Sequence, residues 1–329
     1  MVRAVVAIRR DPLAYLESVV ARWGDLVAFP MPRTPVLLVN TVAGARRVLV
    51  ENHAAYSKRT AQYGALSLVT GTGLLTADGA QWRRRRRLDQ PAFHHSSLEN
   101  VAGESVAAAE RVRHAVPARG GVVDVDSAAL QATLEVVGRT LFGGTMAGEG
   151  ERVVAAVLDA LDVVVARART PVPVPRWAPT PGNRRLRRSV ATLDAAARDV
   201  VAARRAVGVR DTDTDLLALL LRAADAGDLA PHEVRDELVT TVIAGHETVA
   251  SALTWTLHLL ATHPAVQARL HTELDDVLAG RAPSWTDLGS LPYTRAVVDE
   301  ALRLYPPAWV VSRRAETGDE LDGVAVPAG

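Results

Sequence analysis

The stretch Val242-Ile243-Ala244-Gly245-His246-Glu247-Thr248-Val249 interrupts the apolar pattern of a long helix that the sequence predicts over residues 232–262. A glycine inside a helix costs roughly 1 kcal/mol relative to alanine, and a Glu-Thr pair in an apolar run needs polar partners. Small Ala244 and Gly245 allow a close approach to the backbone, and the Thr248 hydroxyl can bond the Ala244 carbonyl and open the helix locally. Irregular turns of this kind often mark functional sites.

Two other interpretations of this stretch can be weighed against the sequence. A zinc protease would need a second histidine four residues after His246, but that position is Ala250, so this class is excluded. A tolerated polar kink that faces a loop stays open when the motif is taken alone.

A charged pair lies near the end of a second predicted helix, residues 292–304. Glu300 and Arg303 are three residues apart, so they can pair on one helical face. Their apolar neighbours predict a buried, charge-assisted pair whose spare donors need further acceptors. Pro306-Pro307 then ends the helix. The alternative is an ordinary surface ion pair, which contributes little to stability.

A basic run, Gln81-Trp82-Arg83-Arg84-Arg85-Arg86-Arg87-Leu88, lies in a predicted helix over residues 79–90. Successive helical residues advance about 100°, so consecutive arginines surround the helix and cannot all face water if it packs. Trp82 and Arg86 share one face. A tryptophan beside a guanidinium on a partly buried face indicates an enclosed anion such as a pair of carboxylates. A solvated basic face and a nucleic-acid patch are the alternatives.

The rest of the pattern predicts one large, mainly helical domain, residues 1–329, with a minor β region formed by distant segments. Asp11-Pro12 favours a helix start, and Leu26–Pro30 with Pro35–Asn40 predicts a hairpin. Further helices are predicted over residues 41–51, 97–116, 127–141, 148–169, 183–207, 214–225 and 264–279, and a second β region over 308–326.

Two segments are predicted to lack regular structure. Tyr56–Asp78 contains Gly64, Gly71 and Gly73, which interrupt any long element. Thr170–Gly182 carries five prolines and predicts an exposed, stiff connection.

Composition limits the class of protein. The 329 residues are 48% hydrophobic and 23% charged, with a net charge of +1, as in a soluble globular protein without a global attraction to nucleic acid or membrane. Without any cysteine, the chain has no disulfide, no thiolate metal ligand and no cysteine nucleophile. Neither a signal peptide nor a run of about 18 apolar residues is present, so a cytoplasmic location is expected.

The order and spacing of these motifs resemble the bacterial cytochrome P450 haem monooxygenases. The resemblance rests on Trp-x-x-x-Arg, then Ala-Gly-x-Glu-Thr on a long helix, then Glu-x-x-Arg-x-x-Pro followed by Arg-x-Ala. It runs through nearly the whole chain. It implies a mostly helical domain with haem b held between two long helices.

The resemblance also implies roles for single residues. Trp82, Arg86 and Arg313, with Arg314 a weaker candidate, match positions that bind the haem propionates. The groove in which dioxygen lies corresponds to Ala244 and Gly245. The acid-alcohol pair that relays protons to iron-bound oxygen corresponds to Glu247 and Thr248. The buried pair that holds the core beneath the haem corresponds to Glu300 and Arg303.

The implied chemistry is insertion of one atom of O2 into a C–H or C=C bond of a hydrophobic small molecule such as a terpenoid or fatty-acyl compound. Electrons would come from a ferredoxin or flavoprotein reductase, which Arg83, Arg84 and Arg87 could attract. Val324–Gly329 resembles the end of a strand entering a turn, and the family's cysteine ligand lies beyond it. We therefore expect a C-terminally truncated P450, inactive as written. The alternatives are a non-catalytic helical binding protein derived from a P450 and, less in keeping with the net charge, a nucleic-acid binder.

Overall fold

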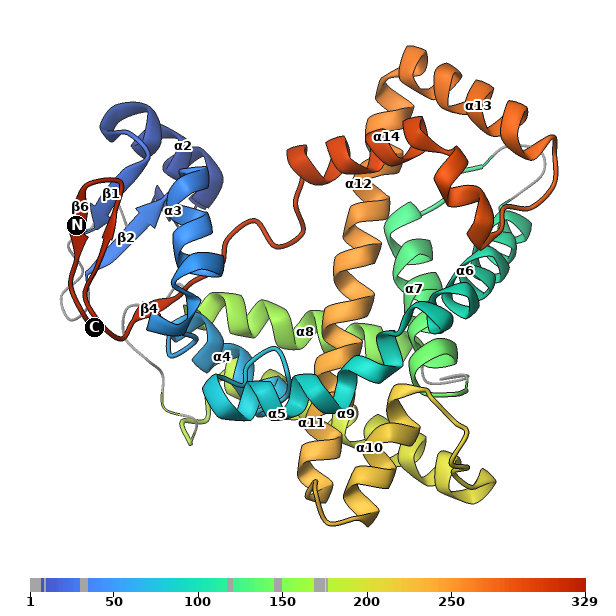
Figure 1. The fold of residues 1–329 in the computed structure, drawn as a ribbon, viewed down its shortest axis with the longest axis horizontal. Coiled ribbons are helices and arrows are strands. Elements are labelled where there is room, and N and C mark those ends of the chain that lie inside the picture. Colours follow the sequence, from blue (N-terminus) through green and yellow to red (C-terminus); the bar gives the residue numbers. More distant parts are fainter. Residues whose placement is uncertain are drawn as a thin grey trace. The chain divides into compact units, whose positions relative to one another are not determined.

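The structure is a computed structural model that describes residues 7–8, 10–29, 35–116, 121–144, 150–168, 175 and 177–329. The chain divides into two compact units (Figure 1). The first comprises residues 1–65, 165–174 and 312–329, and the second comprises residues 66–164 and 175–311. The expectation of one domain over residues 1–329 stays a prediction.

The first unit combines short helices with paired strands. Its described elements are α2 (Pro12–Trp23), β1 (Leu26–Phe29), β2 (Val36–Val39), α3 (Val42–Arg46), a π-helical turn (Arg47–Glu51), β3 (Tyr56–Ser57), β4 (Arg314–Ala315), β5 (Asp319–Leu321) and β6 (Val324–Val326). The Asp11 side chain accepts a hydrogen bond from the Ala14 amide at 3.0 Å, which confirms the predicted helix start. Antiparallel pairing of β1 with β2 confirms the hairpin.

Two distant parts of the chain meet in the first unit. Strand β3 pairs antiparallel with β4, so a minor β region formed by distant segments is confirmed. Asp319 accepts hydrogen bonds from the side chains of Arg47, Asn52 and Tyr56, each at 2.9 Å. The Arg47 guanidinium, followed by Asn52, holds the pKa of the Asp319 carboxyl well below its usual range. Charge-assisted bonds therefore tie the last strands to the first helices of this unit.

The second unit is almost entirely helical, which confirms the mainly α prediction. Its elements are α5 (Gly79–Asp89), α6 (His95–Ala115), α7 (Val125–Leu141), α8 (Gly150–Ala168), α9 (Pro181–Val207), α10 (Leu216–Asp225), α11 (Pro231–Val242), a π-helical turn (Ile243–Glu247), α12 (Thr248–Thr262), α13 (Pro264–Leu278), a 3₁₀ turn (Trp285–Ser290) and α14 (Pro292–Leu304). Within the described residues, no helix has both the length and the hydropathy to cross a bilayer.

Helix α12 is central to this unit. It packs against α7 on one side and against α13 and α14 near its C-terminal end (Figure 1). Ala129, Leu130 and Ala250 form a buried apolar cluster between α7 and α12, and Val154 of α8 packs against it. The small Ala250 lets the two helices approach closely. This junction fixes the position of the turn that precedes α12.

The predicted loop over Tyr56–Asp78 is wrong in its central part. Helix α4 spans Ala61–Thr70 and contains Gly64. One glycine lowers helix stability by only about 1 kcal/mol, which packing of the apolar residues around it can offset. Gly71 ends the helix with φ +61°, so Gly71 interrupts the chain as predicted and Gly64 does not.

The proline-rich connection over Thr170–Gly182 is only partly testable. Residues 170–174 and 176 lie outside the described residues. Pro181 and Gly182 are the first residues of α9, which corrects the predicted C-terminal limit of the connection. Thr180 caps this helix, since its side chain accepts from the Asn183 amide at 3.2 Å. Proline fits the first helical turn because its missing N–H would have no partner there.

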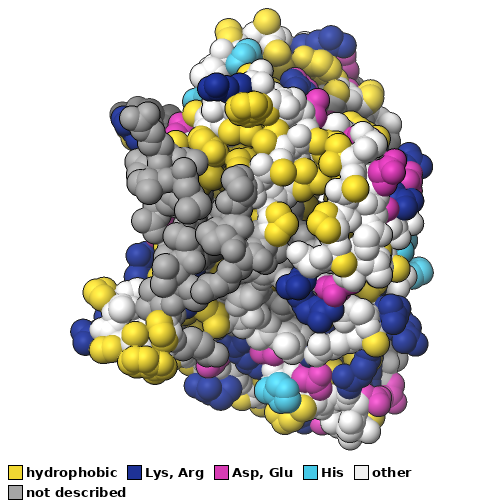
Figure 2. Space-filling view, turned by 90° about the vertical axis from the view of Figure 1, so that its left-hand side faces the viewer, with side chains coloured by type: hydrophobic (Ala, Val, Ile, Leu, Met, Phe, Trp, Pro, Cys, Tyr) yellow, Lys and Arg dark blue, Asp and Glu magenta, His cyan; other side chains and the backbone are white. Residues whose placement is uncertain are grey.

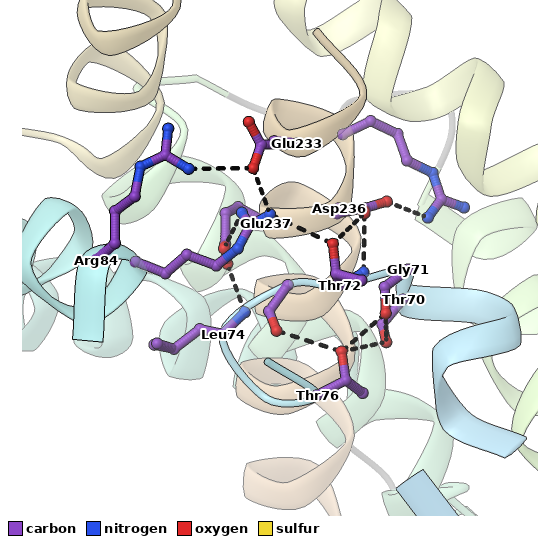
Figure 3. A network of polar contacts seen from close by, with 12 residues as sticks. Thr70, Gly71, Thr72, Leu74, Thr76, Arg84, Glu233, Asp236 and Glu237 are labelled. Atoms are coloured by element: carbon purple, nitrogen blue, oxygen red, sulfur yellow. Dashed lines mark hydrogen bonds and ion pairs between the residues drawn. The ribbon is translucent and has the colours of Figure 1, made fainter. Parts of the chain in front are cut away.

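A buried polar network joins α5, the turn after α4 and α11 (Figure 3). The Arg85 side chain is fully buried and donates to Glu237 at 2.6 Å and to Glu233 at 3.1 Å. Glu237 also accepts from the Leu74 amide at 2.9 Å. Asp236, one residue earlier, accepts from the Thr72 amide at 2.9 Å. Acidic residues of α11 therefore hold both the basic helix and the 71–76 turn in place.

Glycine is required in this turn for space. A Cβ atom on Gly71 would lie 2.1 Å from the Asp236 carboxylate, and one on Gly73 would lie 2.0 Å from Thr240 Oγ1. Neither position can carry a side chain while α11 keeps its hydrogen bonds. The turn therefore has this sequence because α11 packs directly on its backbone.

Arg85 also compensates a second buried acid. Asp89 lies one helical turn further along α5 and is 2% exposed. Burial, followed by the neighbouring Glu237 carboxylate, raises the pKa of Asp89 to about 7, while Arg85 acts in the opposite direction. Burial likewise raises the pKa of Glu237. Loss of the guanidinium would leave two acids without their cation.

We expect Arg85→Met to lower the free energy of unfolding by about 3–5 kcal/mol, because it breaks a buried pair on one side only. Chemical denaturation measures this change. Arg84→Met is the matched control, since Arg84 pairs with the same Glu233 from an exposed position and should cost less than about 1 kcal/mol. The double variant Arg85→Met/Glu237→Leu should recover much of the loss. Equal effects of Arg84→Met and Arg85→Met would contradict this account.

Candidate active site

The helix irregularity that the sequence predicts is present. The π-helical turn Ile243–Glu247 separates α11 from α12. The Thr248 hydroxyl donates to the Ala244 carbonyl at 2.6 Å, which is the predicted bond. This side chain therefore caps a backbone oxygen within the widened turn.

Glu247 and Thr248 are adjacent in sequence but have different surroundings. Thr248 is half-buried and bonded to its own helix. Burial raises the pKa of the Glu247 carboxyl, and the nearby carboxylate of Asp126 on α7 adds to that effect. Asp126 also accepts from the Thr254 hydroxyl at 3.1 Å, two turns further along α12. Glu247 therefore holds its proton to higher pH than an ordinary glutamate.

Ala244 and Gly245 lie in the turn as expected. Ala244 is exposed, whereas Gly245 is half-buried. A Cβ atom on Gly245 would lie 3.2 Å from Val137 Cγ2, so α7 packs tightly against this glycine. The close approach predicted at Gly245 is therefore made by a helix of the chain itself. The predicted role in contacting dioxygen is not tested by this geometry.

Sequence reasoning missed the burial of His246. Its side chain is fully buried, and neither ring nitrogen forms a hydrogen bond with the described residues. Burial lowers the pKa of His246 to about 4, and the Leu130 backbone acts in the opposite direction. The imidazole is therefore neutral near pH 7. The sequence does not indicate this burial, because His246 lies between Gly245 and the acidic Glu247.

Trp82 and Arg86 share one face of α5, but that face is exposed. Trp82 is 38% exposed, and the Arg86 guanidinium forms no ion pair with the described residues. The predicted partial burial of this pair is wrong here. The enclosed guanidinium of the run is Arg85, which lies about 100° around the helix from Arg86 and reaches Glu233 and Glu237 of α11. Five consecutive arginines carry the same charge, so the sequence alone could not show which of them is buried.

Arg313 belongs to the first unit and is half-buried. Its Nη1 donates to the Tyr63 hydroxyl at 2.9 Å and to the Ser312 carbonyl at 2.9 Å. The guanidinium carbon lies 5.5 Å from the centre of the Tyr63 ring. Arg314 is exposed in β4. Of the two, Arg313 has the more fixed orientation, in agreement with its choice as the stronger candidate.

Glu300 and Arg303 pair as predicted, through two bonds of 2.7 Å each. Their side chains, however, are 55% and 66% exposed, so the predicted burial is wrong in this structure. The Arg303 guanidinium lowers the pKa of Glu300. Only part of the α14 surface is covered, because within the described residues the helix packs on α12 and α13. The apolar neighbours Leu302 and Leu304 are also 39% and 45% exposed.

The second unit offers surfaces of the kind that an apolar, dianionic cofactor needs. Val249, Leu253 and Leu257 repeat every four residues along α12 and are 43–48% exposed, which makes an apolar strip beyond the π turn. The Arg86 cation can bind a carboxylate. The residues present therefore fit a haem edge and a propionate. No axial thiolate can come from these 329 residues, which contain no cysteine, and the described residues contain no cluster of three or more potential metal ligands.

The sequence of this chain is similar to those of known proteins. The family described as "Cytochrome P450" matches residues 4–329. Cyclooctat-9-en-7-ol 5-monooxygenase of Streptomyces melanosporofaciens is 36% identical over 98% of this chain and 70% of its own length. Pentalenene oxygenase of Streptomyces avermitilis is 36% identical over 97% of this chain and 71% of its own length. Cyclooctatin synthase of Streptomyces melanosporofaciens is also 36% identical, over 97% of this chain and 69% of its own.

We expect the buried His246 to make stability pH-dependent. The unfolded chain binds a proton near pH 6.5 and the folded protein only near pH 4, so the free energy of unfolding should fall as pH drops through that interval. At pH 5 the loss attributable to His246 is about 2 kcal/mol relative to pH 7.5. His246→Leu should remove this part of the pH dependence in denaturation experiments. His232→Leu, at an exposed position of α11, should leave it unchanged; equal pH slopes in wild type and His246→Leu would refute the assignment.

Proposed function

Because this chain belongs to the cytochrome P450 family, we propose that it oxygenates a small hydrophobic terpenoid at the π turn between α11 and α12. It is a haem-dependent monooxygenase that uses O2 as co-substrate. The observation that supports this site best is the widened turn itself, where exposed Ala244 lies beside the hydroxyl of Thr248.

Haem, when bound, activates O2 so that one oxygen atom enters a C–H or C=C bond and the other leaves as water. This chemistry consumes protons, and Glu247 and Thr248 are the groups proposed to deliver them. The raised pKa of Glu247 suits a proton donor, because the acid form persists closer to neutral pH. The Thr248 hydroxyl both donates and accepts, so it can pass a proton on after releasing the Ala244 carbonyl.

We assign a haem propionate to Trp82 and Arg86 of the second unit, and the propionate role proposed for Arg313 rests on the family resemblance. Arg86 presents a cation without a competing ion pair among the described residues, and the tryptophan indole beside it is a hydrogen-bond donor. Arg313 retains donors beyond its bonds to Tyr63 and Ser312, because a guanidinium carries five N–H groups.

A terpenoid substrate is favoured by the relatives. Three of them are named for pentalenene, cyclooctat-9-en-7-ol and cyclooctatin. The apolar strip of Val249 and Leu253 beyond the turn is compatible with a hydrocarbon substrate or with the haem face. Residues 249–257 of α12 include no acidic or basic side chain that could bind a charged substrate.

P450 enzymes receive electrons from a redox partner, and we propose a ferredoxin or flavoprotein reductase here. Arg83 and Arg87 are exposed on α5 and can attract an acidic protein surface. Basic and acidic side chains are interspersed on the described part of the face in Figure 2, so that face presents no extended basic region of the kind nucleic-acid binders use.

A second candidate is a non-catalytic helical binding protein derived from a P450. The exposed apolar residues of α12 are compatible with it, because such a surface can bind a hydrophobic ligand without any oxygen chemistry. The two candidates share an apolar binding surface and differ in whether oxygen chemistry occurs.

Isotope labelling tests the oxygenase proposal. Because these residues contain no cysteine, the purified protein would be incubated with hemin, a small thiol to supply the thiolate ligand, pentalenene as the probe, ferredoxin, its reductase, NADPH and ¹⁸O2. We expect a product that carries one ¹⁸O atom and forms only when both hemin and the thiol are present. Binding of pentalenene without any labelled product would instead support the non-catalytic candidate.

We expect Arg86→Leu to weaken hemin binding roughly 10- to 100-fold, the effect of losing one charge-assisted bond. Absorption titration measures the affinity. Arg84→Leu, about 200° around the same helix from Arg86, is the control and should change it by less than about twofold. Hemin dimethyl ester, which lacks free carboxylates, should bind wild type and Arg86→Leu equally. A loss of the same size for the ester would show that Arg86 does not contact a propionate.

A further inference from the structure

One face of α7 contacts the π turn directly. Leu130, Thr133 and Val137 lie on this face at helical spacing, and each is less than a tenth exposed. Val137 packs at Gly245, as described above, and the adjacent His246 has a fully buried side chain. The turn is therefore seated on α7 immediately before the two residues proposed to transfer protons.

The Thr133 hydroxyl makes the polar contact at this junction. Its Oγ1 lies 3.1 Å from the His246 carbonyl oxygen, 2.8 Å from that of Ala129 and 3.2 Å from that of Leu130. A hydroxyl donates only one proton, so the bond to His246 competes with two bonds inside α7. A carbonyl oxygen accepts two hydrogen bonds, so His246 can receive this one in addition to any bond within its own helix.

We propose that Thr133 is a positioning residue for oxygen activation: its hydroxyl holds the His246 carbonyl and so fixes the π turn that orients Glu247 and Thr248. A π turn departs from the regular i to i−4 bonding of the helix, and a donor from a neighbouring helix stabilises the departure. The catalytic half of this inference rests on the proposed roles of Glu247 and Thr248. The structural half depends only on the contact between α7 and the turn.

Hydrogen exchange tests the structural half. Thr133→Val removes the hydroxyl at nearly constant volume, and we expect the amides of residues 247–251 to exchange about 3- to 10-fold faster, as for loss of one hydrogen bond. Thr133→Ser should restore wild-type rates. Thr140→Val is the matched control, because Thr140 lies on the same helix and donates only to Val136, at 2.7 Å. Equal exchange in Thr133→Val and Thr140→Val would overturn the proposal.

Product yield tests the catalytic half in the hemin-loaded protein. The fraction of NADPH electrons recovered in product should fall about threefold or more in Thr133→Val, with KM unchanged, and recover in Thr133→Ser. Thr248→Val is the reference for a direct loss of the relay. If Thr248→Val lowers this fraction and Thr133→Val does not, the positioning role is refuted. If Thr248→Val itself has no effect, the proposed relay fails, while hydrogen exchange still decides the role of Thr133 in the turn.

A second variant keeps the proposal testable if Thr133→Val does not fold. Gly245→Ala places a methyl group 3.2 Å from Val137 Cγ2 and should loosen the same junction. We expect faster exchange over residues 247–251, and a partial return toward wild-type rates in Gly245→Ala/Val137→Ala. Unchanged exchange in Gly245→Ala would show that α7 does not hold the turn.

Discussion

The packing of α7 against the π turn of Ile243–Glu247 is the contact on which the site depends. Gly245 permits the close approach of Val137, and the His246 ring is buried next to it. π-helical turns are rare in proteins, and this one is in contact with α7 through Val137 and the Thr133 hydroxyl. We propose that these contacts hold the turn and so the residues that follow it.

A second constraint positions the basic helix α5. Arg85 is fully buried against Glu233 and Glu237, and this orients the rest of the helix. Because successive residues advance by about 100°, burial of Arg85 directs Arg86 outward on another face. The acids of α11 thus determine which guanidinium is structural and which can bind an anion. Helix α11 continues into the π turn, so this one element positions both α5 and the turn.

The sequence was informative where local chemistry decides structure. The Asp11 cap, the hairpin, the long helix with its Thr248 to Ala244 bond and the Glu300–Arg303 pair were all predicted from residue type and spacing. Predictions of which side chains are buried were less accurate. An apolar neighbourhood in sequence did not bury the Glu300 pair, and one glycine did not prevent α4, because both outcomes depend on which elements pack on the segment.

The sequence by itself determined the family, the helical class and the positions of the chemical groups, because these are encoded in the order and spacing of motifs along the chain. Only the tertiary structure decided that Arg85 and not Arg86 is enclosed, that His246 is buried and neutral, and that Thr133 faces the turn. Thr133 and His246 are more than a hundred residues apart in the sequence. Contacts of this kind arise from helix packing, which the periodicity of either helix alone cannot specify.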